Sequence, residues 1–237
     1  MSVSLRIIAV FFLAVLPNMV HAAFITTKEA QLDAIYSQAN FGSKIIDIRI
    51  GTATELVYPE FLDITASSEV NQLFSLHQGP ANVVNFYFID TISACGSFTS
   101  ASIVGCGEYR GNDFVVESTF AAGWSGAELL AHELGHNLGL PHLSGNYLMN
   151  PSLNRSTLLT PAEITTIFLS PLVQNENDYY WIDINPVLIV AAATTVDEPA
   201  SLLLFMLVGG MFYRLRRQRM KPLKLSDAFC CKQGIAA

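Results

Sequence analysis

The chain has 237 residues, of which 51% are apolar and 14% are charged, and its formal net charge is −7. This composition excludes an intrinsically disordered chain, which combines low hydrophobicity with high charge, and it also excludes collagen-like and coiled-coil sequences. Two apolar segments, one near each end, account for much of the apolar character, so the region between them is considered separately.

The first 22 residues have the pattern of a secretory signal peptide. Arg6 precedes ten uncharged, apolar residues at 7–16, and Val20-His21-Ala22 provides the small-x-small pattern of a cleavage site. A run of this length is too short for a transmembrane anchor, which needs roughly 20 residues. We therefore expect residues 1–22 to direct export to the periplasm, the cell surface or the medium.

The region between the apolar ends, residues 23–195, is the expected folded domain. Apolar spacing and capping residues predict helices over 28–39, from Ser67 or Ser68 to about 77, over 124–138 and over 160–169. Runs of β-branched and aromatic residues predict strands over 45–50, 83–89 and 114–116, and extended chain over 179–190. The last of these helices opens with Thr160-Pro161-Ala162-Glu163, a capping box with proline at the first helical position.

The charge of this domain argues against a nucleic-acid partner. Residues 23–195 contain 17 of the 20 acidic residues and five of the 13 basic residues, so the domain carries about 12 net negative charges. Binding to a phosphate backbone requires a basic surface instead. We expect no nucleic acid among the partners of this protein.

Four cysteines divide between the domain and the C-terminal tail. Cys95 and Cys106 lie in the domain, and Cys230 and Cys231 lie in the tail. In an oxidising compartment, the first two are expected to form a disulfide, and the alternative is a pair of free thiols.

The central chemical signal is the segment from His132 to His142, which reads His-Glu-Leu-Gly-His-Asn-Leu-Gly-Leu-Pro-His. His132 and His136 are four residues apart on a helix, so both rings project from one face. Gly139 permits the sharp turn that ends the helix and brings His142 in as a third ligand. Three histidines leave one position open for water, as a catalytic zinc site requires, and Glu133 is placed to act as its general base.

The extended spacing of this segment, followed by Tyr147-Leu148-Met149-Asn150-Pro151 with Met149 seven residues beyond His142, resembles the zinc motif and Met-turn of the metzincin metalloproteases. The resemblance implies that His132, His136 and His142 bind one zinc ion, that Glu133 is the catalytic base, and that Met149 forms the floor of the site.

The same resemblance implies an α+β fold. It consists of a mixed, twisted sheet with an active-site helix, followed by a small lower subdomain with a C-terminal helix, here 160–169. In the family, the edge strand of the sheet pairs with an extended peptide, and a pocket beside the third histidine takes one substrate side chain. Residues 140–147 and 150–153 are expected to shape that pocket. The substrate is therefore expected to be a protein or peptide.

The C-terminal region has the pattern of a membrane segment with a basic end inside. Residues 200–213 are uncharged and apolar, and six cations follow, at Arg214, Arg216, Arg217, Arg219, Lys221 and Lys224. A buried core helix is the alternative. With Val196-Asp197-Glu198-Pro199 in front, residues 196–219 resemble the PEP-CTERM sorting signal of exported bacterial proteins. This resemblance implies inner-membrane anchoring, processing by an exosortase and a cytoplasmic tail at 220–237.

These patterns predict an exported zinc endopeptidase. Two other functions fit the same residues. One is an envelope or matrix interaction protein in which zinc is structural, and the other is a zinc hydrolase that acts on a non-peptide amide. The presence of Glu133 favours an enzyme, because a structural zinc site has no need of a base.

Overall fold

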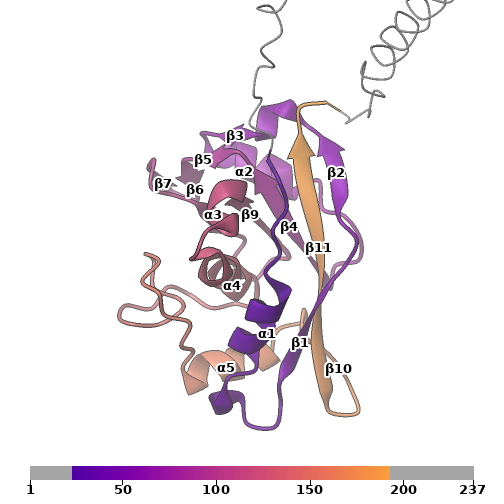
Figure 1. Ribbon diagram of the computed structural model, residues 1–237, viewed down its shortest axis with the longest axis vertical. Helices are drawn as coiled ribbons and strands as arrows, with labels where there is room; N and C mark the ends of the chain where they lie inside the picture. The colour runs from indigo at the N-terminus through magenta and orange to yellow at the C-terminus, as the bar shows by residue number, and fades with distance from the viewer. Residues whose placement is uncertain (1–22, 193–237) are drawn as a thin grey trace, which may run out of the picture. The chain divides into compact units, whose positions relative to one another are not determined.

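A computed structural model describes residues 23–192 of the chain (Figure 1). The expected signal peptide and sorting signal lie outside these residues, as does the apolar segment 200–213. Within the described range, no helix is both long enough and apolar enough to cross a membrane.

The described residues form a mixed α+β fold around a seven-stranded sheet. Its strands are β1 (Ile46–Ile50), β2 (Thr54–Val57), β4 (Val83–Ile89), β8 (Gly105–Gly107), β9 (Asp113–Glu117), β10 (Gln174–Glu176) and β11 (Tyr179–Val190). The main order is β1-β11-β4-β9-β8, and β2 and β10 also pair with β11. Strands β8 and β10 run antiparallel to their neighbours, whereas the other pairs are parallel. The observed sheet is therefore mixed, as expected from the sequence analysis.

The last strand of the described residues, β11, lies in the interior of the sheet between β1 and β4 (Figure 1). One edge of β11 pairs first with β1, up to Ile184, and then with β2 from Val187 onward. Pro186 lies between these two stretches. Ile184 directs its carbonyl towards Gly51 on this edge, so the N–H that Pro186 lacks would face the gap between β1 and β2. A proline is tolerated in this interior strand because the N–H that it lacks would have no partner strand at this point.

Helices cover both faces of the sheet. One face carries α1 (Glu29–Tyr36), α4 (Gly126–Asn137) and α5 (Pro161–Phe168), and the other carries α2 (Ser67–Phe74). Alternate residues of β4 point into the two cores: Phe86 and Phe88 pack beneath α4, and Tyr87 and Ile89 pack beneath α2. This explains why 83–89 is apolar except for the buried Asn85, since a strand buried on both faces has no polar side.

The smaller elements are two helical turns, one short helix and two short strand pairs. They are η1 (Ala39–Phe41), η2 (Pro59–Phe61), α3 (Ser118–Ala122), the pair β3 (Asp63–Ile64) and β5 (Thr91–Ile92), and the hairpin β6 (Ala94–Cys95) and β7 (Phe98–Thr99).

The helix starts show which capping predictions hold. At α5, the Glu163 carboxylate accepts the N–H of Thr160 at 2.7 Å, and the Thr160 hydroxyl accepts the N–H of Glu163 at 3.2 Å, so the predicted capping box is confirmed. At α2, the residue before the helix is Ala66 rather than a serine. Glu69 satisfies the free donors there by accepting the N–H groups of Thr65 and Ala66 at 2.7 and 2.9 Å.

The glycine- and serine-rich stretch before β9 contains more structure than its composition suggests. It forms the β6–β7 hairpin and the edge strand β8, and the predicted disulfide between Cys95 and Cys106 joins the two. Their Cα atoms are 5.6 Å apart. A disulfide of this kind is typical of an oxidising compartment.

Candidate metal centre

Helix α4 presents His132 and His136 one turn apart and ends where the sequence predicts. Gly139 has φ +92°, the left-handed conformation that glycine adopts most readily. The N–H of Gly139 bonds to the carbonyl of His136, and the N–H of Leu140 reaches back to the carbonyl of Gly135, which is a Schellman motif. This ending reverses the chain immediately after the second histidine.

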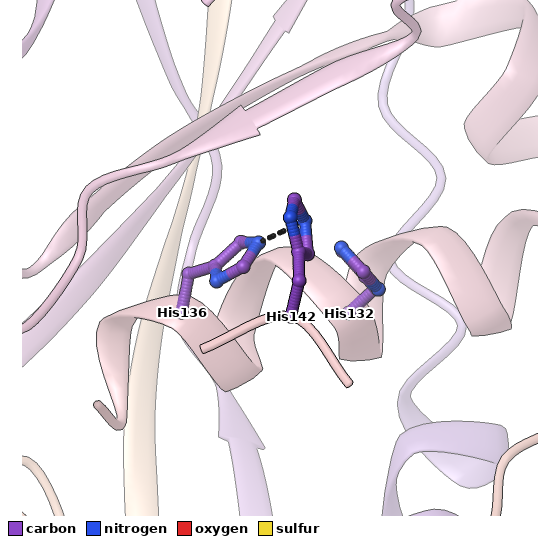
Figure 2. A group of neighbouring side chains, drawn as sticks. All are labelled: His132, His136 and His142. Carbon is purple, nitrogen blue, oxygen red and sulfur yellow. Dashed lines mark hydrogen bonds between the residues drawn. The ribbon is translucent and has the colours of Figure 1, made fainter. Parts of the chain in front are cut away.

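The reversal carries His142 back beside the helix. Figure 2 shows the three imidazole rings grouped on one side of α4, with His142 between the other two. One ligand nitrogen from each ring lies within 4.8 Å of the others, and the Nε2 atoms of His136 and His142 are 3.1 Å apart. The three histidines predicted to be ligands are therefore close enough to bind one metal ion.

The backbone fixes the orientation of two of these rings. Nδ1 of His132 lies 2.8 Å from the carbonyl oxygen of Leu148, and Nδ1 of His136 lies 2.9 Å from that of Leu140. Each Nδ1 donates to its carbonyl, so each Nε2 carries a lone pair, which at His136 lies 3.1 Å from Nε2 of His142. A backbone carbonyl behind a histidine ligand is the usual way in which proteins orient metal-binding imidazoles.

Burial keeps the cluster in the neutral form that binds metal. Desolvation lowers the pKa of His132 to about 4, and the neighbouring imidazoles oppose its protonation further. Burial also lowers the pKa of His136 and of His142. Because only neutral imidazole can donate a lone pair, protons compete weakly with a metal at this site.

Glu133 is buried between α4 and the edge strand β8. A Cβ atom on Gly105 would lie 2.6 Å from Glu133 Oε1, and one on Gly107 would lie 3.1 Å from Oε2. The carboxylate therefore rests against bare backbone. Burial raises the pKa of Glu133 to about 8, although the N–H of Gly107 partly opposes the rise. A divalent cation nearby would favour the ionised carboxylate.

Met149, which the resemblance places at the floor of the site, packs against α4 at Gly135. Its side chain is fully buried, and a Cβ atom on Gly135 would lie 2.5 Å from its sulfur. The main-chain carbonyl of Met149 accepts the N–H of Leu143 at 2.8 Å, which ties the residue after His142 to this turn.

The donor set fits a zinc ion. Three neutral imidazoles, two of them oriented by carbonyls, are typical zinc ligands, and a buried carboxylate adjoins the first of them in sequence. Within residues 23–192, the three histidines are the group of potential ligands that the structure brings together.

Sequence analysis missed two parts of this site. One is the Gly-Cys-Gly strand β8, whose glycines leave room for Glu133, and the alternation of glycine around a cysteine was its available signal. The other is Glu128, a buried carboxylate on α4 that contacts the loop beyond Met149. Its position four residues before His132 was the clue.

No known protein family, curated protein or solved structure matches this chain. Its function is therefore inferred from the site and from the sequence patterns.

Proposed function

We propose that this protein is an exported zinc endopeptidase of the metzincin type, with His132, His136 and His142 as zinc ligands and Glu133 as general base. The observation that carries the proposal is the convergence of three neutral imidazoles, together with a buried carboxylate that follows the first of them in the sequence. The spacing of these residues, the glycine turn and the underlying methionine agree with the resemblance.

A zinc ion held by these histidines would act as a Lewis acid and bring the pKa of a water molecule towards ~7. The residues of the chain supply the remaining functions. The Glu133 carboxylate removes the proton from the attacking water and delivers it to the amine leaving group. The carbonyls of Leu148 and Leu140 hold two imidazoles in the ligand tautomer.

The edge strand β8 supports a peptide substrate. Its neighbours Val104 and Glu108 are hydrogen-bonded to β9, through Glu117 N–H to Val104 O and through Glu108 N–H to Asp113 O. Alternation along an antiparallel ladder then directs the main-chain groups of Gly105 and Gly107 away from β9. The N–H of Gly107 bonds to the Glu133 carboxylate, and an extended peptide can pair with the other main-chain groups on this edge, next to the general base.

The chain order differs from that expected of the family at one point. The resemblance places the sheet before the active-site helix and a small subdomain after it. Here the chain adds β11 after α5, as an interior strand of the sheet between β1 and β4. The proposal therefore assigns the helix, the metal centre and the edge strand to the metzincin type, with a different chain path for β11.

Export and retention complete the proposal. A signal peptide at 1–22 directs secretion, and the segment 196–219 anchors the protein in the inner membrane until an exosortase processes it. The Cys95–Cys106 disulfide supports an oxidising location for the domain.

The alternative of a structural zinc site is less well supported by the ligand set. Structural sites usually have four protein ligands, whereas the cluster within the described residues contains three histidines. A hydrolase acting on a non-peptide amide would use the same groups, so the substrate screen must include such amides.

The test is zinc content and peptide-library cleavage by the purified full-length protein and by Glu133→Gln. We expect one zinc per chain in both proteins, and a loss of cleavage of about 10²–10⁴-fold in the variant. Glu69→Gln, which changes a remote carboxylate at the start of α2, is the matched control and should retain cleavage. Zinc without cleavage in the wild type would favour an alternative function, and a folded protein without zinc would contradict the proposal.

A further inference from the structure

Glu128 is a buried carboxylate one turn before the first histidine. It lies on α4 four residues ahead of His132, so the two side chains share a face of the helix. It is only 5% exposed, and within residues 23–192 no lysine or arginine forms an ion pair with it. A carboxylate in such a place requires strong hydrogen-bond donors to compensate for its lost hydration.

Those donors come from the loop that follows Met149. Oε1 of Glu128 accepts the main-chain N–H of Asn154 at 2.7 Å and that of Arg155 at 3.0 Å. Arg155 has φ +68°, a conformation that a non-glycine residue adopts only when its surroundings impose it. Its guanidinium lies 4.5 Å from the centre of the Trp124 ring, just before α4. Both its backbone and its side chain are thus fastened to the start of the helix.

The anchored residues are joined to the rest of the loop. The Asn154 side chain donates to the carbonyl of Gly145 at 2.9 Å, and the Ser156 hydroxyl donates to that of Asn146 at 2.8 Å. The N–H of Leu148 bonds to the carbonyl of Leu158 at 2.9 Å. These bonds connect residues 145–158 into one unit.

This unit supplies the carbonyl that orients the first metal ligand. The N–H of Leu148 donates to the carbonyl of Leu158, and the carbonyl oxygen of Leu148 lies 2.8 Å from His132 Nδ1. Hydrogen bonds therefore connect Glu128, through Asn154 and the loop, to His132, which lies one turn further along α4. The helix holds the loop at one residue, and the loop holds the histidine at another.

We propose that Glu128 is a positioning residue for the metal centre: by fixing the loop at Asn154 and Arg155, it sets the place of the Leu148 carbonyl and so the orientation of His132. This role rests on the proposed function, because it assumes that the histidines bind a metal. Glu128 itself touches neither substrate nor reacting atoms.

The test compares metal binding by the full-length wild type, Glu128→Ala and Glu128→Gln. The readouts are the zinc dissociation constant, from competition with a chromogenic chelator, and the visible absorption spectrum with cobalt(II) alone. We expect Glu128→Ala to bind zinc about tenfold more weakly or worse and to show an altered cobalt spectrum. Glu128→Gln keeps an acceptor oxygen, so its loss should be smaller.

The matched control is Glu69→Ala. Glu69 also accepts two main-chain N–H groups, but at the start of α2 on the opposite face of the sheet. Its replacement should lower stability and leave the zinc affinity and the cobalt spectrum unchanged. If both alanine variants weaken zinc binding equally, the effect is one of general stability and the proposal is overturned.

A second variant covers a failure of Glu128→Ala to fold. Asn154→Ala keeps the N–H that Glu128 accepts and removes the link to Gly145, so it should also weaken zinc binding and alter the cobalt spectrum. An unchanged affinity and spectrum in the folded variants overturns the positioning role alone. Absence of metal binding by the wild type overturns the proposed function, and this inference with it.

Discussion

The sulfur of Met149 lies against Gly135, the residue of α4 that directly precedes His136. A Cβ atom at residue 135 would come within 2.5 Å of that sulfur, and within 3.5 Å of a Leu140 methyl group. The packing of Met149 therefore requires glycine at this position between His132 and His136.

This contact predicts that Gly135→Ala destabilises the protein despite the higher helix propensity of alanine. Overpacking of a full core should lower the free energy of unfolding by about 1–3 kcal/mol, as measured by urea denaturation. In a Met149→Ala background, Gly135→Ala should lower the free energy of unfolding by less, because the smaller side chain leaves room for the new methyl group. Additive effects of the two changes would contradict the contact.

The glycines of β8 predict a defect in catalysis rather than in folding. A side chain at Gly105 would displace the Glu133 carboxylate, since the added Cβ would lie 2.6 Å from Oε1. Under the proposed function, Gly105→Ala should lower kcat while zinc content is retained. Ser97→Ala, in the exposed turn of the neighbouring hairpin, is the control and should cleave peptides at the wild-type rate. Equal kcat values for both variants would contradict a catalytic base, Glu133, that packs against β8.

Stability should depend on pH through Asp113. Its pKa is raised chiefly by burial, although hydrogen bonds from His77 and Asn85 oppose the rise. An acid whose pKa is higher in the folded state binds its proton more tightly there, so the unfolding free energy falls as pH rises from the unfolded to the folded pKa. Asp113→Asn lacks this effect.

The measurement is urea denaturation of both proteins between about pH 3 and pH 6. The stability of the wild type relative to Asp113→Asn should decrease across this range. A relative stability that rises with pH would show that the hydrogen bonds outweigh burial and that the pKa of Asp113 is lowered rather than raised.

The disulfide should contribute measurably to stability. It closes a short loop between the β6–β7 hairpin and β8, for which chain entropy gives about 2–3 kcal/mol. Reductant should therefore lower the urea midpoint of the wild type, and Cys95→Ser should show the lowered midpoint without reductant. In Cys230→Ser/Cys231→Ser, the effect of reductant should persist. A midpoint that is insensitive to reductant only in this last variant would assign the effect to the tail.

Much of the candidate metal centre was predictable because its residues lie close together in the sequence. His132 and His136 share a helix face because of their spacing, and Gly139 ends the helix because of its conformational freedom. His142 then follows three residues after Gly139. The capping box at Thr160 and the strands over 83–89 and 179–190 were likewise predictable, since each depends on neighbouring residues.

The tertiary structure alone decided which distant segments meet. Periodicity identified 179–190 as extended, yet only pairing with β1 and β2 on one edge and with β4 on the other places it in the interior of the sheet. The role of the glycines in β8 depends on the approach of Glu133, and that of Glu128 on a loop 26 residues further along the chain. Spacing within a helix determines which side chains share a face, whereas long-range packing determines what that face meets.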